Sequence, residues 1–146
     1  MLDIETIHHI SLVVTDLDRA RAFYSGVLGL EETDRPDFAF DGAWYRLGDR
    51  SLHLIVPEPG DAPTFRHDKA IDSHDAHFAI RVRSYRQAVE HLQSKGYRQS
   101  QDANPKPDAA NPLPMRLNPT GKVGFPQIYI LDPDRNVIEI NAEKDE

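Results

Sequence analysis

The 146-residue chain contains no cysteine. Disulfide bonds, thiolate catalysis and cysteine-type zinc sites are therefore excluded, and any bound metal must be held by imidazole and carboxylate groups. No apolar run approaches the roughly 20 residues that span a bilayer, so we expect no membrane partner. The first residues lack the basic region and apolar core of a signal peptide, and we therefore expect a cytoplasmic protein.

Basic residues are also fewer than acidic residues. Lys and Arg number 17 against 24 Asp and Glu, which gives a formal net charge of −7. A duplex nucleic-acid binder needs a basic face, so this balance argues against nucleic-acid partners. The chain has no P-loop, no dinucleotide glycine pattern and no Gly-x-Ser-x-Gly motif. Hydrophobic residues make up 39%, which is enough for one globular domain or two small fused modules.

A short signature occurs twice. It reads His-Ile-Ser-Leu-Val-Val over 9–14 and His-Phe-Ala-Ile-Arg-Val over 77–82. Each copy predicts a strand, and each leads into a helix-start signal. Asp16 is a good N-cap for the first helix, and Ser84 with Gln87 forms a capping box for the second. Gly29 and Gly96 are expected to end the two helices.

Three short strands are expected after each helix, so the pattern predicts two modules of strand, helix and three strands. In the first module the expected strands are Leu30–Arg35, Ala43–Leu47 and Ser51–Val56. In the second they are Tyr97–Ser100, Gln127–Leu131 and Asn136–Asn141, with Asn136 able to take the left-handed turn conformation.

Two proline-bearing stretches interrupt this pattern. Pro57–Asp75 is interpreted as a linker, so that modules 1–58 and 74–146 form a single domain. Gln101–Pro126 is expected to be a long loop, either functional or a tolerated surface insertion.

Four side chains on the first and last strands of the modules turn away from the helices. Side chains alternate between faces along a strand, which places His9, His53, His77 and Glu139 on the faces that the helices leave uncovered. Three imidazoles and a carboxylate suit one divalent ion such as Zn, Ni, Fe, Mn or Co. A single strand histidine is, however, more often structural, so the pattern alone leaves both interpretations open.

Two further residues are candidates for substrate binding. Arg81 shares the face of His77 and can meet an anionic group, or can lie in solvent at the strand end. Tyr129 can line a pocket or pack in the core. Trp44 and Tyr45 lie on opposite faces of their strand, and the register that decides which one lines the site is not fixed by the sequence.

These residues resemble the vicinal-oxygen-chelate (VOC) superfamily, the glyoxalase/bleomycin-resistance/extradiol-dioxygenase group. Residues 9–30 are similar to its opening pattern of a His-led strand, an Asp-Leu cap, a Phe-Tyr pair and a Leu-Gly-Leu stop. Residues 130–140 are similar to its closing pattern, Asp-Pro-Asp-Gly-Asn followed by an apolar-Glu-Leu ligand strand. The two stretches lie near the two ends of the sequence, and the resemblance covers nearly the whole chain.

The resemblance implies an α+β fold in which two βαβββ modules form a curved, incomplete barrel, the glyoxalase-like fold. It also implies one divalent metal on His9, His53, His77 and Glu139, a small-molecule substrate, and a homodimer with or without exchanged modules. Two positions depart from the pattern. His53 stands where glyoxalase I proteins generally carry Glu and methylmalonyl-CoA epimerases Gln, and Arg135 replaces the turn glycine.

The function expected from the resemblance is that of a glyoxalase I-like lyase or isomerase, acting on a small carbonyl compound or its thiol adduct through a metal-chelated enediolate. Glu139 is then both a metal ligand and the candidate catalytic base. The alternatives are an Fe(II) extradiol-type dioxygenase using His9, His77 and Glu139, a fosfomycin-type thiol transferase, and a non-enzymatic binding protein of bleomycin-resistance type.

Overall fold

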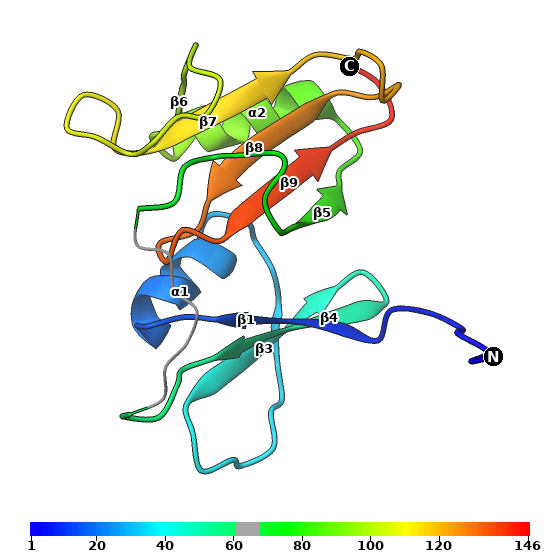
Figure 1. Ribbon diagram of the computed structural model, residues 1–146, viewed down its shortest axis with the longest axis vertical. Helices are drawn as coiled ribbons and strands as arrows, with labels where there is room; N and C mark the ends of the chain where they lie inside the picture. Colours follow the sequence, from blue (N-terminus) through cyan, green and yellow to red (C-terminus); the bar gives the residue numbers. More distant parts are fainter. Residues whose placement is uncertain (61–67) are drawn as a thin grey trace. The chain divides into compact units, whose positions relative to one another are not determined.

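The computed structural model describes residues 1–60 and 68–146. The chain divides into two compact units, residues 1–65 and 66–146, each of which contains its own sheet and helix (Figure 1). The division falls inside the predicted linker, Pro57–Asp75, of which residues 61–67 lie outside the described part. Each unit is described by itself below.

The first unit contains one helix and a four-stranded sheet. Its elements are β1 (His9–Val13), α1 (Leu17–Tyr24), β2 (Glu32–Thr33), β3 (Gly42–Leu47) and β4 (Arg50–Ile55). The sheet order is β1-β4-β3-β2. β1 runs parallel to its neighbour β4, whereas β3 is antiparallel to both β4 and β2. The first and last long strands of the unit are therefore side by side.

The helix side of this sheet carries its core. The rings of Tyr24 on α1 and Tyr45 on β3 lie 5.9 Å apart, and both side chains are fully buried. Leu52 and Leu54 of β4 are buried as well. Because Tyr45 faces the helix, its neighbour Trp44 must lie on the opposite face, which answers the question that the sequence left open.

The second unit contains one helix and a five-stranded sheet. Its elements are β5 (His77–Arg81), α2 (Tyr85–Ser94), β6 (Arg98–Gln99), β7 (Pro114–Asn118), β8 (Gln127–Leu131) and β9 (Val137–Asn141). The sheet order is β5-β9-β8-β7-β6, and α2 lies along one face of it (Figure 1). β5 is parallel to β9, as β1 is to β4. The α+β class with two open sheets is thus confirmed.

The prediction that Gln101–Pro126 is a loop throughout was wrong. Residues 114–118 form β7, which pairs with both β8 and β6. The prolines of this stretch hid a period-two pattern, in which Met115 is fully buried whereas Arg116 is only half-buried. Pro114 is tolerated because it stands at the first position of the strand.

The helix caps agree with the sequence signals. The Asp16 carboxylate accepts the Arg19 amide at 2.8 Å, and the Ser84 hydroxyl accepts the Gln87 amide at 3.2 Å. Gly96 ends α2 as predicted, because it directly follows the C-cap residue Lys95 with φ 97°, a value that costs glycine little. α1 ends earlier than predicted, at Tyr24 with Ser25 as its C-cap, and Gly29 has φ 71° four residues further on.

The turn before β9 differs from expectation. Arg135, and not Asn136, adopts the left-handed conformation, with φ 64°. Asn136 is held by Asp132, whose carboxylate accepts both its backbone amide at 2.7 Å and its side-chain amide at 2.8 Å. Those two bonds fix Asn136 at the entrance of the strand, so the reversal falls one residue earlier. The Arg135 guanidinium then donates to the Lys69 carbonyl at 3.2 Å.

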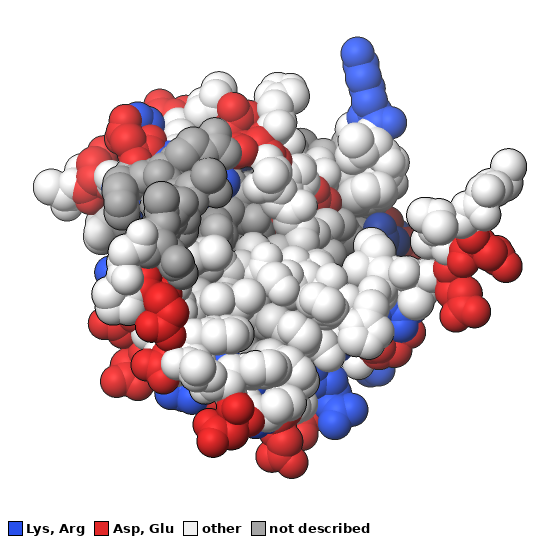
Figure 2. Space-filling model, turned by 60° about the horizontal axis from the view of Figure 1, so that its bottom comes forward, with Lys and Arg blue, Asp and Glu red and all other residues white. Residues whose placement is uncertain are grey.

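The strand β9 is buried along its whole length. Ile138 and Ile140 belong to the helix side of the sheet. The other side is partly covered by Ile71, which forms a buried cluster with Tyr129, Leu131 and Val137. Part of the predicted linker therefore packs into the second unit. Acidic and basic side chains are both visible at the surface in Figure 2. No helix within residues 1–60 and 68–146 has the length and apolar character to cross a bilayer.

We predict that Gly42→Ala destabilises the protein by about 1–3 kcal/mol, because an added methyl group has no room. A β-carbon there would collide with the Leu54 carbonyl oxygen and lie 3.2 Å from Nε of Arg35. Urea unfolding measures the change. Gly121→Ala is the matched control, since its added carbon would be no nearer than 3.7 Å to its neighbours. Equal stability of the two variants would contradict the prediction.

Candidate functional site

The first unit brings two of the predicted ligands together. The rings of His9 and His53 stack with centroids 4.3 Å apart and planes 15° from parallel. Trp44 stacks on His53 at 4.1 Å and 7°. Burial lowers the pKa of His53, and the neighbouring His9 and His8 lower it further. A histidine held neutral in this way keeps a lone pair available for a metal ion.

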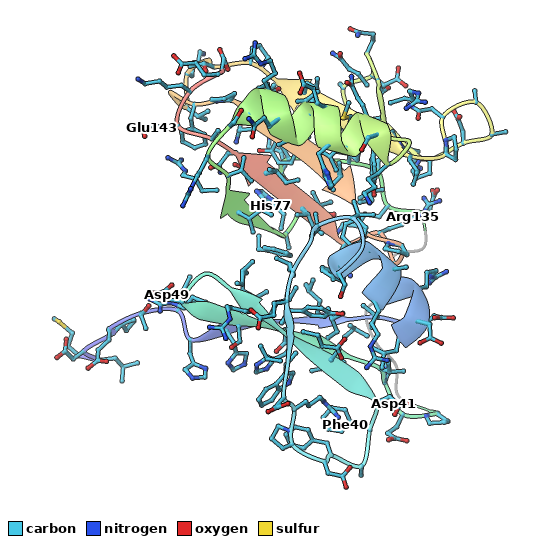
Figure 3. All side chains as sticks on the ribbon, turned by 180° about the vertical axis from the view of Figure 1, so that it is seen from behind. Phe40, Asp41, Asp49, His77, Arg135 and Glu143 are labelled. Atoms are coloured by element: carbon cyan, nitrogen blue, oxygen red, sulfur yellow. The ribbon has the colours of Figure 1, made fainter. Side chains whose placement is uncertain are left out.

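The second unit brings the other two together. Nε2 of His77 lies 3.3 Å from Oε2 of Glu139, and the Glu139 side chain is only 7% exposed. Figure 3 shows His77 on β5, beside β9. The sequence placed these two residues on one face, and the structure confirms that they meet.

The hydrogen bonds of His77 define its tautomer. Nδ1 lies 2.7 Å from the carbonyl oxygen of Asp75, and because a carbonyl has no proton to give, Nδ1 must be the donor. In a neutral ring Nε2 then carries the lone pair, and this lone pair faces the Glu139 carboxylate. Two acceptors at 3.3 Å are favourable only with a cation between them or a proton on Nε2. Histidine ligands of metals commonly show the same bond from the other ring nitrogen to a carbonyl.

Glu139 is held by neutral donors. The Tyr129 hydroxyl donates to Oε2 at 2.9 Å, and the Asn141 amide donates to Oε1 at 2.8 Å. Gln127 in turn donates to the Tyr129 hydroxyl at 2.8 Å. Burial by itself raises the pKa of Glu139, but the donors Asn141, Gln127 and Tyr129 together with His77 outweigh it and leave the pKa below its usual value. Glu139 is therefore ionised at neutral pH.

The two pairs occupy equivalent places in the two sheets. In the first unit, the residue two after His9 pairs with His53; in the second, the residue two after His77 pairs with Glu139. The equivalence extends to the next strand, because Trp44 is the direct partner of His53 and Tyr129 that of Glu139. Each second ligand is thus contacted by an aromatic residue from the adjacent antiparallel strand.

Arg81 lies at the end of the same face as His77. Its Nε donates to Oδ1 of Asn141 at 2.9 Å, and its guanidinium lies 5.0 Å from the Phe125 ring centre. Arg81 is thereby linked to Glu139 through a single amide side chain. Its predicted role in binding an anionic group stays a prediction, as does the substrate contact predicted for Tyr129, which is 3% exposed.

Within residues 1–60 and 68–146, no group of three or more His, Asp or Glu side chains can hold a metal. The predicted ligands form two pairs, one in each unit. Sequence reasoning did not assign roles to Trp44, Asn141 and Gln127. Asn141 could have been found, since it is two residues beyond Glu139 on one strand and must share its face.

The comparison with protein families identifies the superfamily. The model of the Glyoxalase/Bleomycin resistance protein/Dioxygenase superfamily matches residues 8–112, well over half of the chain. The chain belongs to this superfamily. The matched segment includes His9, His53 and His77 and ends before the strand that carries Glu139.

Similar proteins span several activities. Bovine mitochondrial methylmalonyl-CoA epimerase is 32% identical over 98 residues, 63% of this chain and 55% of the bovine protein, so the chain spans about half the length of this relative. A glyoxalase family protein from Bacillus anthracis superposes with a TM-score of 0.71 at 22% identity, covering 99% of both chains.

Two further solved structures share the fold. Lactoylglutathione lyase from Agrobacterium tumefaciens has a TM-score of 0.65 and 21% identity, over 97% of this chain and 96% of that one. A variant of the fosfomycin resistance protein FosX from Listeria monocytogenes, complexed with Mn(II) and a dihydroxypropylphosphonic acid, has a TM-score of 0.63 and 17% identity, over 95% and 92%. At these identities the structures establish the fold alone.

We predict that Tyr129→Phe raises the pKa of Glu139, because the substitution removes one donor to the carboxylate. The folded-state pKa lies below the ordinary value of 4.5, so ionised Glu139 stabilises the fold above that pH and the contribution is lost as the pH falls. The variant should therefore lose less stability than the wild type on acidification.

A carboxyl NMR titration of Glu139, with acid unfolding curves alongside, measures both effects. Tyr85→Phe on α2 is the control and should leave the titration of Glu139 unchanged. A Tyr129→Phe protein with the wild-type titration would show that the hydroxyl has no influence on Glu139.

Proposed function

We propose that the protein is a metal-dependent lyase or isomerase of glyoxalase I type, which moves a proton next to the carbonyl group of a small compound or of its thiol adduct. The four residues His9, His53, His77 and Glu139 hold one divalent ion, within one chain or across a dimer. The observation that carries the proposal is the His77–Glu139 pair, in which Nε2 and a carboxylate oxygen lie 3.3 Å apart and a proton or a metal ion must lie between them.

The donor set fits such an ion. Imidazole nitrogen and carboxylate oxygen are ligands of Zn, Ni, Fe, Mn and Co, and they are hard enough to exclude a preference for Cu(I). The second-unit donors are already oriented by their neighbours, as ligands in metal sites usually are. When bound, the ion supplies Lewis acidity that stabilises negative charge developing on substrate oxygens.

The residues of the chain have separate tasks in this proposal. Glu139 is ionised and can accept a proton at neutral pH, and its two oxygens are kept in place by Tyr129 and Asn141. Arg81 carries a fixed positive charge on the same face and binds an anionic part of the substrate. Proton transfer next to a carbonyl is the chemistry shared by glyoxalase I and by epimerases. Because His53 matches the residue of neither at this position, the substrate assay must decide between them.

The experiment is metal analysis of untagged protein, followed by assays with methylglyoxal–glutathione hemithioacetal and with catechols. Retention of a divalent ion and turnover of the hemithioacetal or of another carbonyl substrate support the proposal. Iron with oxygen-dependent ring opening of catechols would instead identify a dioxygenase. Protein that binds none of Ni, Zn, Mn and Fe would identify a small-molecule binding protein.

We predict that Glu139→Gln lowers turnover by about a hundredfold or more, since the amide can neither accept the proton nor supply the negative charge. Circular dichroism should show the fold intact, because a glutamine keeps the shape of the side chain. Glu143→Gln, an exposed position shortly after the same strand, is the matched control and should retain wild-type activity. Full activity of Glu139→Gln would remove Glu139 from the proposed role.

We predict that Arg81→Met raises KM by about ten- to hundredfold for an anionic substrate while kcat changes less, because a charged hydrogen bond to bound substrate is lost. Steady-state kinetics measure the two constants. Arg83→Met, at an exposed position two residues later, provides the control. Equal KM values for the two variants would show that the anionic group of the substrate does not bind Arg81.

The homodimer, with or without exchanged modules, stays a prediction. Analytical ultracentrifugation measures the mass in solution. Mixing a His77→Ala protein with a His9→Ala protein then tests the exchange, because shared sites would recover metal binding in the hybrid.

A further inference from the structure

Three aromatic rings form a continuous stack on the open face of the first sheet. His9 belongs to β1, His53 to the central strand β4, and Trp44 to β3. The stacking distances are 4.3 Å on the His9 side and 4.1 Å on the Trp44 side. Since β1 and β3 flank β4 on opposite sides, the ring of His53 lies between the other two.

The stack confines His53 far more than His9. An imidazole clamped between two rings can present only its edge, and turning it would break both stacking contacts. His9 is exposed and, among the described residues, stacks on His53 alone, and its Nδ1 lies 2.8 Å from Nδ1 of the exposed His8. His53 is half-buried under Trp44.

This geometry bears on metal binding. A metal ion lies in the plane of each imidazole that ligates it. The ring planes of His9 and His53 are only 15° from parallel and are stacked, so they do not meet near the rings. Both histidines can bind one ion only if one ring turns, and the confined His53 is the one that stays.

We propose that Trp44 is a positioning residue that fixes the ring of His53 for metal binding, whereas His9 turns to complete the site. The inference rests on the proposed metal site and adds a residue to it. The equivalent position in the second unit supports it, because Tyr129 holds Glu139 from the same place in the register. A stacking contact holds His53 in the first unit, and a hydrogen bond holds Glu139 in the second.

Trp44 is the only tryptophan in the chain, so its fluorescence reports on the stack directly. The experiment measures Ni²⁺ and Zn²⁺ affinity by calorimetry for the wild type, Trp44→Leu and Trp44→Phe, with thermal unfolding as a check on the fold. Phe38→Leu is the control, because Phe38 contacts Trp44 at 6.1 Å and lies outside the histidine stack.

We expect Trp44→Leu to bind both ions about three- to tenfold more weakly, since the freed imidazole must be ordered on binding. Trp44→Phe and Phe38→Leu should stay within about twofold of the wild type, because a phenyl ring can still stack on His53. Rescue by the phenyl ring separates positioning from a general loss of packing. Wild-type affinity in Trp44→Leu overturns the inference and leaves the metal site standing.

A second measurement uses the wild type alone, in case Trp44→Leu does not fold. NMR contacts between the rings of Trp44 and His53 should persist when Zn²⁺ is added, and those between His9 and His53 should disappear. Loss of the Trp44–His53 contacts overturns the inference. A wild-type protein that binds neither ion overturns this inference, and one that also binds neither Mn nor Fe overturns the proposed function as well.

Discussion

The parallel pairing of the first and last long strands in each unit is the constraint on which the candidate site depends. It sets β1 beside β4 and β5 beside β9, and in both sheets the ligand of the last strand lies opposite the residue two beyond the leading histidine. A slip of one residue would send every one of these side chains to the helix side. The apolar residues of the opposite face, such as Leu52 and Ile138, resist that slip because they are fully buried.

The chemistry of the two pairs differs although their positions correspond. The second unit is rich in hydrogen bonds, and Glu139 is held ionised by Tyr129 and Asn141 despite its burial. In the first unit the ring of His53 is held by stacking against His9 and Trp44. The fold therefore duplicates the placement of a ligand and leaves each copy free to support it differently. His53 is an imidazole, and its neighbour Trp44 stacks on it. Tyr129, in contrast, donates a hydrogen bond to a carboxylate.

Several features of the fold could be predicted from the sequence because their signals are local. The caps at Asp16 and Ser84, the stop at Gly96 and the faces of His9 and His77 follow from short-range rules that the structure confirms. Strand alternation also predicted the faces of His53 and Glu139, since it needs no knowledge of the neighbouring strands.

The features that could not be predicted depend on contacts between residues beyond a short sequence pattern. The strand at 114–118 was missed because its prolines mask a pattern that pairing with β8 stabilises. The reversal at Arg135 results from two bonds between Asp132 and Asn136 that no propensity reports. The stack of Trp44 on His53 requires the register of β3 against β4, which the turn between them allows but the residues alone do not specify.

The supporting groups around Glu139 have a common property. The amide side chains of Asn141 and Gln127 do not titrate, and burial raises the pKa of Tyr129 above its ordinary value of 10.0. The carboxylate itself is already ionised well below neutrality. The charge of these supporting groups thus stays constant from mildly acidic to mildly alkaline conditions, and they form a fixed electrostatic frame around Glu139.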